Sequence, residues 1–325
     1  MNLNERMFVM LDLKVSSLPT VIQEHEVQRQ VHKTLLGLNC RVVKKFSSSK
    51  LIFVSLREFM LYVNELSLEL PRNFDVVCAI PRTGLLVGGW LSERWNVPLS
   101  TPQFLANALC WGVSGSNAST ETLAKGDFKR ILLVDDSVGS GETIIEAEET
   151  IRAGLGNVDI VKAAVFVSHQ GKTKVDYFKR VIHGVDSVFE WSLPSSRYGN
   201  WQIAADLDGV VCEDPPAEVL KDETKYEKWL GQARPLFVPS YPFDAIVSGR
   251  LEKHRKQTVD WLEGHGVKFK SLVLAKSVSE SLHKVTVLRR LKPRFYIESD
   301  KTLAKDIWKM TGIPTLCYQT MTMFS

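Results

Sequence analysis

The chain has 325 residues, of which 44% are hydrophobic and 24% charged, a composition typical of soluble globular proteins. The length predicts two domains of roughly 150 residues each. The 41 basic and 37 acidic residues leave a net charge of only +4, which favours neither a nucleic-acid partner nor a membrane partner. The five cysteines form no CxxC pair, which argues against a disulfide framework or a zinc site and favours a cytoplasmic location.

In chain order, apolar runs alternate with amphipathic stretches, which is typical of an α/β protein. We expect strands over residues 76–80, 131–134, 161–168, 201–206, 245–248, 271–275 and 295–298. We expect helices over residues 85–95, 142–153, 251–264, 283–291 and 303–310, and a solvated helix face over the charged run 221–228. The Ser-, Pro- and Gly-rich segment 192–200 predicts a linker, which gives domains over 1–198 and 199–325. Residues 1–70 have weak periodicity and predict no chemistry.

The segment 131–143, ILLVDDSVGSGET, predicts a phosphate-binding turn. An apolar strand leads into two adjacent carboxylates, Asp135 and Asp136, at the strand end where ligands of open α/β sheets bind. A turn of glycines and hydroxyls and the start of a helix follow, and they offer backbone N–H groups to an anion. Acids beside such a turn suit ribose hydroxyls and a metal ion that accompanies a pyrophosphate.

This segment resembles the phosphoribosyl pyrophosphate (PRPP) motif of type I phosphoribosyltransferases, which has apolar residues, two acids, small residues and a Thr-Gly-x-Thr turn. Ser140 stands where the family usually has Thr. The resemblance implies that Asp135 and Asp136 bind the ribose 2′- and 3′-hydroxyls and act in catalysis. It also implies that the turn binds the 5-phosphate through Ser137, Val138, Gly139, Ser140, Gly141, Glu142 and Thr143.

A second match lies about 50 residues upstream, where residues 75–84 have the sequence DVVCAIPRTG. In the same family, a loop of the form Pro-Arg-Ser/Thr-Gly after an earlier strand binds pyrophosphate. The resemblance implies that the planar guanidinium of Arg82 binds pyrophosphate oxygens and that Thr83 and Gly84 supply backbone donors. Between the two motifs, the polar stretch 101–125 predicts a mobile lid, although it has fewer basic residues before Lys125 than many relatives.

A second pair of acids appears in residues 201–211, WQIAADLDGVV. A strand ends in Asp-Leu-Asp-Gly, which places Asp206 and Asp208 on the same side of the chain just past the edge of a sheet. A Mg²⁺ ion can bridge such acids and a phosphate, so that Asp206 attacks phosphorus and Asp208 protonates the leaving oxygen. The regularly spaced ligands of an EF-hand calcium loop do not follow.

This segment resembles the first motif of the haloacid dehalogenase (HAD) superfamily, and the later motifs follow in order. Ser248, in AIVSGR, matches the residue that hydrogen-bonds the phosphoryl oxygen. The resemblance implies a cation near the nucleophile, for which Lys284 is preferred and Lys276 is the alternative. It further implies that Glu298, Asp300 or both bind the metal together with Asp206 and Asp208, although Glu-Ser-Asp departs from the usual Asp-Asp or Gly-Asp.

Together the resemblances imply two doubly wound α/β domains, a type I phosphoribosyltransferase fold and a HAD-like Rossmannoid fold without a large cap. The first would transfer ribose 5-phosphate from PRPP to a nitrogenous base with release of pyrophosphate. The second would use Mg²⁺ to hydrolyse a phosphate monoester, such as the 5′-phosphate of the product. The base is not identified, and a homodimer stays open. The alternative is a PRPP-binding regulatory or docking module attached to a stand-alone HAD phosphatase.

Overall fold

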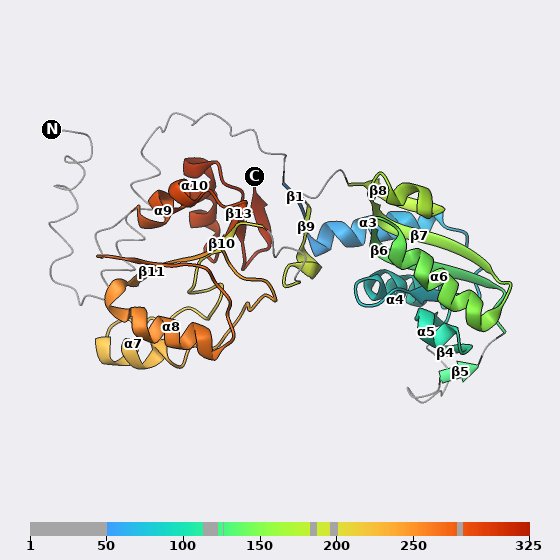
Figure 1. The fold of residues 1–325 in the computed structure, drawn as a ribbon, viewed down its shortest axis with the longest axis horizontal. Coiled ribbons are helices and arrows are strands. Elements are labelled where there is room, and N and C mark those ends of the chain that lie inside the picture. The colour runs from blue at the N-terminus through green and yellow to red at the C-terminus, as the bar shows by residue number, and fades with distance from the viewer. Residues whose placement is uncertain (1–50, 113–122, 126, 183–186, 196–200, 278–281) are drawn as a thin grey trace. The chain divides into compact units, whose positions relative to one another are not determined.

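The computed structural model describes residues 51–112, 123–125, 127–182, 187–195, 201–277 and 282–325. The chain divides into two compact units, Ile52–Ser192 and Leu193–Ser325, and each has a main sheet of its own (Figure 1). The predicted domain boundary at 198–199 falls within residues 196–200, which lie outside the described residues.

Seven strands form the main sheet of the N-terminal unit, in the order β5-β4-β3-β2-β6-β7-β8. The pairs from β3 through β2, β6 and β7 to β8 are parallel, whereas β3–β4 and β4–β5 are antiparallel. The strands are β2 (Val76–Ala79), β3 (Leu99–Ser100), β4 (Leu109–Trp111), β5 (Leu123–Lys125), β6 (Arg130–Val138), β7 (Asp159–Val167) and β8 (Tyr177–Val181). The chain goes from β2 to β3 on one side and continues from β6 on the other, so the strand order reverses between β2 and β6.

Helices cover both faces of this sheet. Alternate residues of a strand point to opposite faces of the sheet. The buried strand residues on one face pack with α3 (Leu56–Glu69) and α4 (Gly84–Trp95). Those of the other face pack with α5 (Pro102–Leu105) and α6 (Glu142–Leu155). A small parallel sheet of β1 (Ile52–Val54) and β9 (Ser187–Phe189) completes the unit, with the 3-10 helices η1 (Gly171–Lys174) and η2 (Glu190–Ser192).

Six strands form the sheet of the C-terminal unit, in the order β12-β11-β10-β13-β14-β15. All pairs are parallel except β14–β15. The strands are β10 (Ile203–Ala205), β11 (Ala245–Leu251), β12 (Leu272–Ala275), β13 (Phe295–Glu298), β14 (Thr315–Cys317) and β15 (Thr322–Phe324). Here the strand order reverses between β10 and β13, because β11 and β12 continue on one side and β14 on the other.

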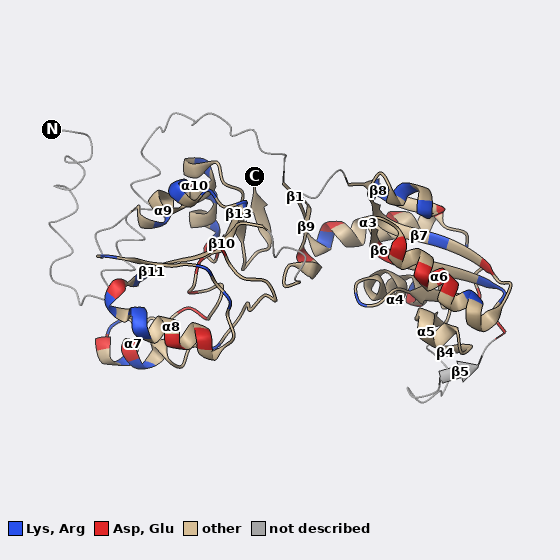
Figure 2. Cartoon of the chain, in the orientation of Figure 1, with Lys and Arg blue, Asp and Glu red and all other residues tan. Residues whose placement is uncertain are grey.

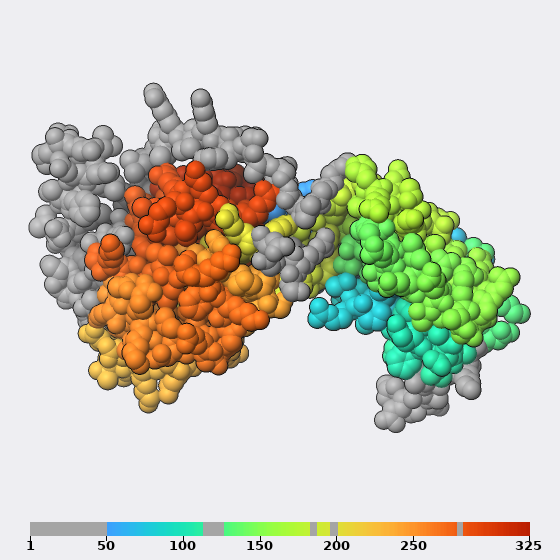
Figure 3. All heavy atoms as spheres, in the orientation of Figure 1, coloured from blue at the N-terminus to red at the C-terminus, as the bar shows by residue number. Residues whose placement is uncertain are grey.

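Two pairs of helices enclose this second sheet. The apolar residues of α9 (His283–Leu291) and α10 (Lys301–Thr311) pack on one face. On the opposite side lie α7 (Glu223–Leu230) and α8 (Arg255–Gly264), which follows the 3-10 helix η4 (Glu252–His254). Figure 2 shows Lys, Arg, Asp and Glu along α7 and α8, and Figure 3 shows this part of the chain at the surface of the unit. This agrees with the prediction for the run 221–228, although Tyr226 is buried.

The α/β architecture confirms the predicted class, and most predicted elements are present with shifted ends. The helix predicted over 251–264 is wrong at its start, because Leu251 extends β11 and α8 begins at Arg255. The stretch 101–125 contains α5 and the paired strands β4 and β5, so it is not loop throughout, and residues 113–122 lie outside the described residues. Across the described part of the chain, no helix combines the length and the apolar character that a membrane span requires.

Candidate functional sites

The first candidate site lies where the strand order of the N-terminal sheet reverses. The last residue pair between β2 and β6 is Ala79 with Val134, so Asp135 and Asp136 follow at the point where β2 has ended. Ligands of open α/β sheets bind in the crevice at such a switch point, beyond the carboxyl ends of the strands. The Pro-Arg-Thr-Gly loop, which connects β2 to α4, opens onto the same place.

Close packing joins this loop to the acids. The Thr83 hydroxyl donates a hydrogen bond of 2.7 Å to Oδ1 of Asp136. A Cβ at position 84 would lie 3.0–3.1 Å from Oδ1 and Cα of Asp135 and from the carbonyl oxygen of Val134, a tight contact that the glycine avoids. The Pro81–Arg82 peptide bond is cis, and the Arg82 side chain is exposed. The structure thus brings the two predicted PRPP motifs together.

The predicted phosphate-binding turn connects β6 to α6. Gly141 is the N-cap of α6 and has a φ of +90°, a left-handed conformation that favours glycine. The Cβ of any other residue there would lie 2.5 Å from Cγ of Lys174, whose aliphatic stem therefore covers the turn. Ser168 holds the start of the turn by donating its hydroxyl to the Gly139 carbonyl at 2.6 Å. Neither Lys174 nor Ser168 was predicted from the sequence, because both approach the turn from a separate segment.

The Asp135 carboxyl is nearly buried, and this sets its ionisation. Burial and the neighbouring Asp136 carboxylate raise the pKa of Asp135 to about 9. An aspartate in an unfolded chain releases its proton near pH 4. The folded unit therefore binds this proton over a pH range in which the unfolded chain does not, and its stability falls as the pH rises from about 4 to about 9.

Asp135→Asn should therefore weaken the pH dependence of stability in this unit and stabilise it at pH 8, because Asn carries no charge into the buried position. Urea-dependent hydrogen exchange of β6 peptides, compared with the original protein at each pH, measures the effect. The control is Asp159→Asn in β7, where the carboxylate is more than half exposed and pairs with Arg130 at 3.3 Å. An unchanged pH dependence in Asp135→Asn would contradict the prediction.

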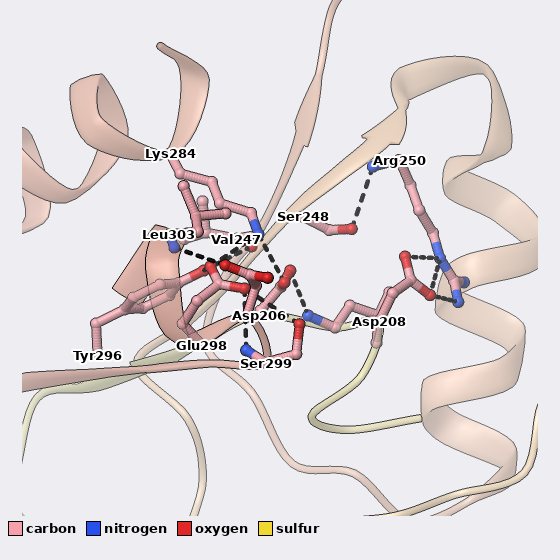
Figure 4. A network of polar contacts seen from close by, with 12 residues as sticks. Asp206, Asp208, Val247, Ser248, Arg250, Lys284, Tyr296, Glu298, Ser299 and Leu303 are labelled. Carbon is pink, nitrogen blue, oxygen red and sulfur yellow. Dashed lines mark hydrogen bonds and ion pairs between the residues drawn. The ribbon is translucent and has the colours of Figure 1, made fainter. Parts of the chain in front are cut away.

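The second candidate site lies where the strand order of the C-terminal sheet reverses. Asp206 follows β10, and Glu298 is the last residue of the neighbouring β13. Lys284 of α9 bridges them, because its Nζ lies 2.6 Å from Oδ2 of Asp206 and 2.9 Å from Oε2 of Glu298 (Figure 4). The structure thus places Lys284, and not Lys276, beside the predicted nucleophile. Lys276 is exposed at the end of β12.

Burial and charge set the ionisation of this trio. Burial disfavours a charge on Lys284, but Asp206 and Glu298 outweigh it and raise the lysine pKa. Burial and the Glu298 carboxylate raise the pKa of Asp206 well above its usual range. Burial would do the same to Glu298, but the Lys284 cation and hydrogen bonds to the carboxylate lower its pKa.

Asp208 does not share the contacts of Asp206. Both of its carboxylate oxygens accept hydrogen bonds from Arg250, at 2.6–3.1 Å (Figure 4). Arg250 is 1% exposed and also donates to Thr258, at 3.5 Å, and to Sγ of Cys212, at 3.2 Å. The sequence analysis did not single out Arg250. A basic residue two positions after Ser248, at the end of a buried strand, is the signal that would have found it.

The other predicted residues of this site differ in how they are held. Ser248 is fully buried in β11, and its Oγ accepts a hydrogen bond from the Arg250 backbone N–H at 3.1 Å. Both Glu298 oxygens are engaged, by the N–H of Ser299 at 2.9 Å and by Lys284 and the Tyr296 hydroxyl. Asp300 is exposed and accepts the Leu303 N–H as the N-cap of α10. This geometry favours Asp300 over Glu298 as a metal ligand.

An excess of negative charge supports a cation at this site. Burial and the carboxylates of Asp208 and Glu298 raise the pKa of Asp214 to about 6. Asp214 was not predicted, and it lies close to Gly209 in the loop after β10. The described residues contain no preassembled group of three or more metal-ligating side chains. The donor chemistry nevertheless fits Mg²⁺, which prefers carboxylates and retains several waters. Asp206 and Asp300 would hold it, and Asp208 would join them only when its pair with Arg250 opens.

Comparison with known proteins identifies one of the two units. Residues 54–196 match the family model described as the phosphoribosyl transferase domain. Matching solved structures include the purine phosphoribosyltransferase of Pyrococcus horikoshii, with 20% identity, 43% of this chain and 92% of that chain covered and a TM-score of 0.34. The xanthine-guanine-hypoxanthine phosphoribosyltransferase of Helicobacter pylori has 19% identity, the same two coverages and a TM-score of 0.34.

The orotate phosphoribosyltransferase of Aeropyrum pernix has 16% identity, 47% of this chain and 92% of that chain covered, and a TM-score of 0.29. No curated protein matches the sequence. The family match ends at residue 196, close to the start of the C-terminal unit. The match contains both predicted PRPP motifs, so the N-terminal unit is similar to the phosphoribosyl transferase domain over residues 54–196.

Proposed function

We propose that the N-terminal unit transfers ribose 5-phosphate from PRPP to a nitrogenous base. The bond between C1 of the ribose and the pyrophosphate oxygen breaks, a bond from C1 to a ring nitrogen of the base forms, and pyrophosphate leaves. The observation that carries the proposal is the packing of the Arg82–Gly84 loop against Asp135 and Asp136, within a segment that matches the family model. This packing supports a site in which the loop would bind pyrophosphate and the neighbouring acids would bind the ribose.

The residues of this unit would act by position and charge. Such a displacement passes through an oxocarbenium-like state at C1, as in glycoside chemistry. Arg82 and the backbone N–H groups after it would stabilise the charge that develops on the leaving pyrophosphate. The turn from Ser137 to Thr143 would hold the 5-phosphate, and the two acids would hold the ribose hydroxyls, so that C1 faces the base.

The test of the transferase is a direct assay. The protein is incubated with PRPP, Mg²⁺ and a panel of purine, orotate-like and other bases, and mass spectrometry detects the nucleotide product. Pyrophosphate release that requires one base supports the proposal and identifies that base. PRPP binding without release of pyrophosphate under any condition would favour the regulatory or docking alternative.

A second activity is proposed for the C-terminal unit on the evidence of the Lys284 bridge. Oδ of Asp206 would attack the phosphorus of a phosphate monoester, the ester oxygen would leave as an alcohol, and water would then hydrolyse the aspartyl-phosphate. Lys284 and Ser248 would bind the phosphoryl oxygens, and Mg²⁺ would supply further charge neutralisation when bound. Asp208 would transfer protons, which requires that its pair with Arg250 opens.

Fusion of the two units suggests consecutive steps, in which a nucleotide is made and its 5′-phosphate is then removed. Incubation of the full chain with the nucleotide found in the transferase assay tests this, with phosphate release compared against p-nitrophenyl phosphate. Faster phosphate release from the nucleotide than from p-nitrophenyl phosphate supports consecutive steps. Equal rates with the two substrates argue that the C-terminal unit has a separate role. A cytoplasmic location and a homodimer remain predictions.

Excess EDTA should silence both activities, because pyrophosphate release and aspartyl-phosphate formation each bring several negative charges together in a small site. Pyrophosphate and phosphate release are followed in the same sample, before and after Mg²⁺ is restored. Added Mg²⁺ should restore both rates. Full activity of either unit in excess EDTA would contradict the magnesium assignment for that unit.

A further inference from the structure

An indole nitrogen holds the second acid of the PRPP motif. Nε1 of Trp191 donates a hydrogen bond of 2.7 Å to Oδ2 of Asp136, from a position 55 residues further along the chain. The other oxygen, Oδ1, accepts the Thr83 hydroxyl, also at 2.7 Å. Asp136 is 4% exposed. Both carboxylate oxygens therefore have a fixed donor, one from the Pro-Arg-Thr-Gly loop and one from η2.

The indole ring itself is held in a stack of aromatic side chains. The centroid of the Trp191 ring lies 4.2 Å from that of Phe59 and 4.8 Å from that of Phe189. The planes of the Trp191 and Phe189 rings are 9° apart. Phe59 belongs to α3 and Phe189 to β9. The Leu56 backbone N–H donates to the Glu190 carboxylate at 2.6 Å and links η2 to α3. The direction of the Trp191 N–H is therefore set by α3 and β9.

Two neutral donors can fix a carboxylate without neutralising it. An ionised carboxylate has about four acceptor positions. Thr83 donates to Oδ1 and Trp191 to Oδ2 at 2.7 Å, and the Ser137 hydroxyl donates a longer bond of 3.4 Å to Oδ1. An acceptor position that these donors leave can receive a ribose hydroxyl. A carboxylate that is free to rotate would have to be ordered when the ligand binds, and this ordering weakens binding.

We propose that Trp191 is a positioning residue, which orients Asp136 toward the ribose hydroxyls of PRPP. The inference rests on the proposed transferase function and extends it to a residue outside both PRPP motifs. If the N–H alone matters, its loss weakens PRPP binding and leaves base binding unchanged. If Trp191 only fills the aromatic core, its replacement lowers stability without a selective effect on PRPP.

Trp191→Phe tests the proposal, because Phe keeps an aromatic ring in the stack and lacks the donor. The control is Trp95→Phe in the same unit, where the indole stacks near Phe74 at 6.2 Å and its buried N–H has no hydrogen-bond partner among the described residues. The probe is PRPP with Mg²⁺, measured by calorimetry and by KM for PRPP and for the base. We expect about tenfold weaker PRPP binding for Trp191→Phe and an unchanged KM for the base, since the lost hydrogen bond is to a charged group.

A second variant keeps the test decisive if Trp191→Phe does not fold. Replacement of Trp191 by 3-benzothienylalanine preserves the bicyclic ring and changes N–H to sulfur, so it should show the same selective loss. PRPP binding equal to that of the original protein, or an equal loss in Trp95→Phe, would overturn the inference. If the original protein binds no PRPP, the proposed function itself fails, and that result is distinct from the other two.

Discussion

Asp206→Asn should reduce phosphatase activity by roughly 10⁴-fold or more, as expected when an acting nucleophile is removed. An amide cannot form the aspartyl-phosphate, but it keeps the size of the side chain. Lys284 keeps its ion pair with Glu298 at 2.9 Å, so the site retains one of its two carboxylate contacts. Phosphate release from p-nitrophenyl phosphate measures the effect, and PRPP-dependent pyrophosphate release should continue.

The matched control for this variant is Asp244→Asn. Asp244 belongs to the same unit and pairs with Lys270 at 3.0 Å, but its partner side chain is 63% exposed. This control should retain its phosphatase activity. In the converse experiment, the double change of Asp135→Asn and Asp136→Asn should remove transfer and spare hydrolysis. Full phosphatase activity in Asp206→Asn would show that Asp206 is not the nucleophile.

Short-range patterns predicted the elements that hold the two sites. The segment 131–143 combines a buried strand, a glycine turn and a helix start, and the structure has β6, the turn at Gly141 and α6 there. The helix predicted over 283–291 has the same ends as α9. In each case the pattern lies within one short segment. Local propensity and the apolar pattern of that segment therefore indicate the same element that the fold contains.

Contacts between distant segments were not predictable from one sequence. Trp191 meets Asp136, and Arg250 meets Asp208 across 42 residues. Neither pair has a characteristic spacing in the sequence, because the two residues come together only when the tertiary structure forms. The helix α3 was missed for another reason. Its buried residues Phe59, Val63 and Leu66 have helical spacing, but exposed Leu61 and Leu68 blur the apolar stripe.

The open choice between Lys284 and Lys276 was also a matter of tertiary structure. Lys276 directly follows β12, and Lys284 lies in the first turn of the helix α9, which comes next along the chain. The register of β10 and β13 puts Asp206 and Glu298 side by side, and α9 then directs Lys284 between them. The Glu298 and Asp206 side chains are only 1% and 7% exposed. Their charges are therefore compensated mainly by Lys284 and not by solvent.

Lys284→Met should therefore lower both the stability of the C-terminal unit and its phosphatase activity. Methionine fills a similar volume but leaves two buried carboxylates without their cation, and removal of one partner from a buried ion pair costs about 3–5 kcal/mol. Repulsion between Asp206 and Glu298 is then unscreened, so one of them must bind a proton and the pKa of Asp206 rises further.

Urea unfolding, read by hydrogen exchange of β10 and β13 peptides, measures the loss of stability, and phosphate release measures the activity. Lys276→Met is the matched control and should change the free energy of unfolding by less than about 0.5 kcal/mol, because the Lys276 side chain is exposed. The loss of stability in Lys284→Met should become smaller at low pH, where protonated carboxylates no longer repel each other. Equal activity losses in the two lysine variants would contradict the assignment of Lys284 as the cation beside Asp206.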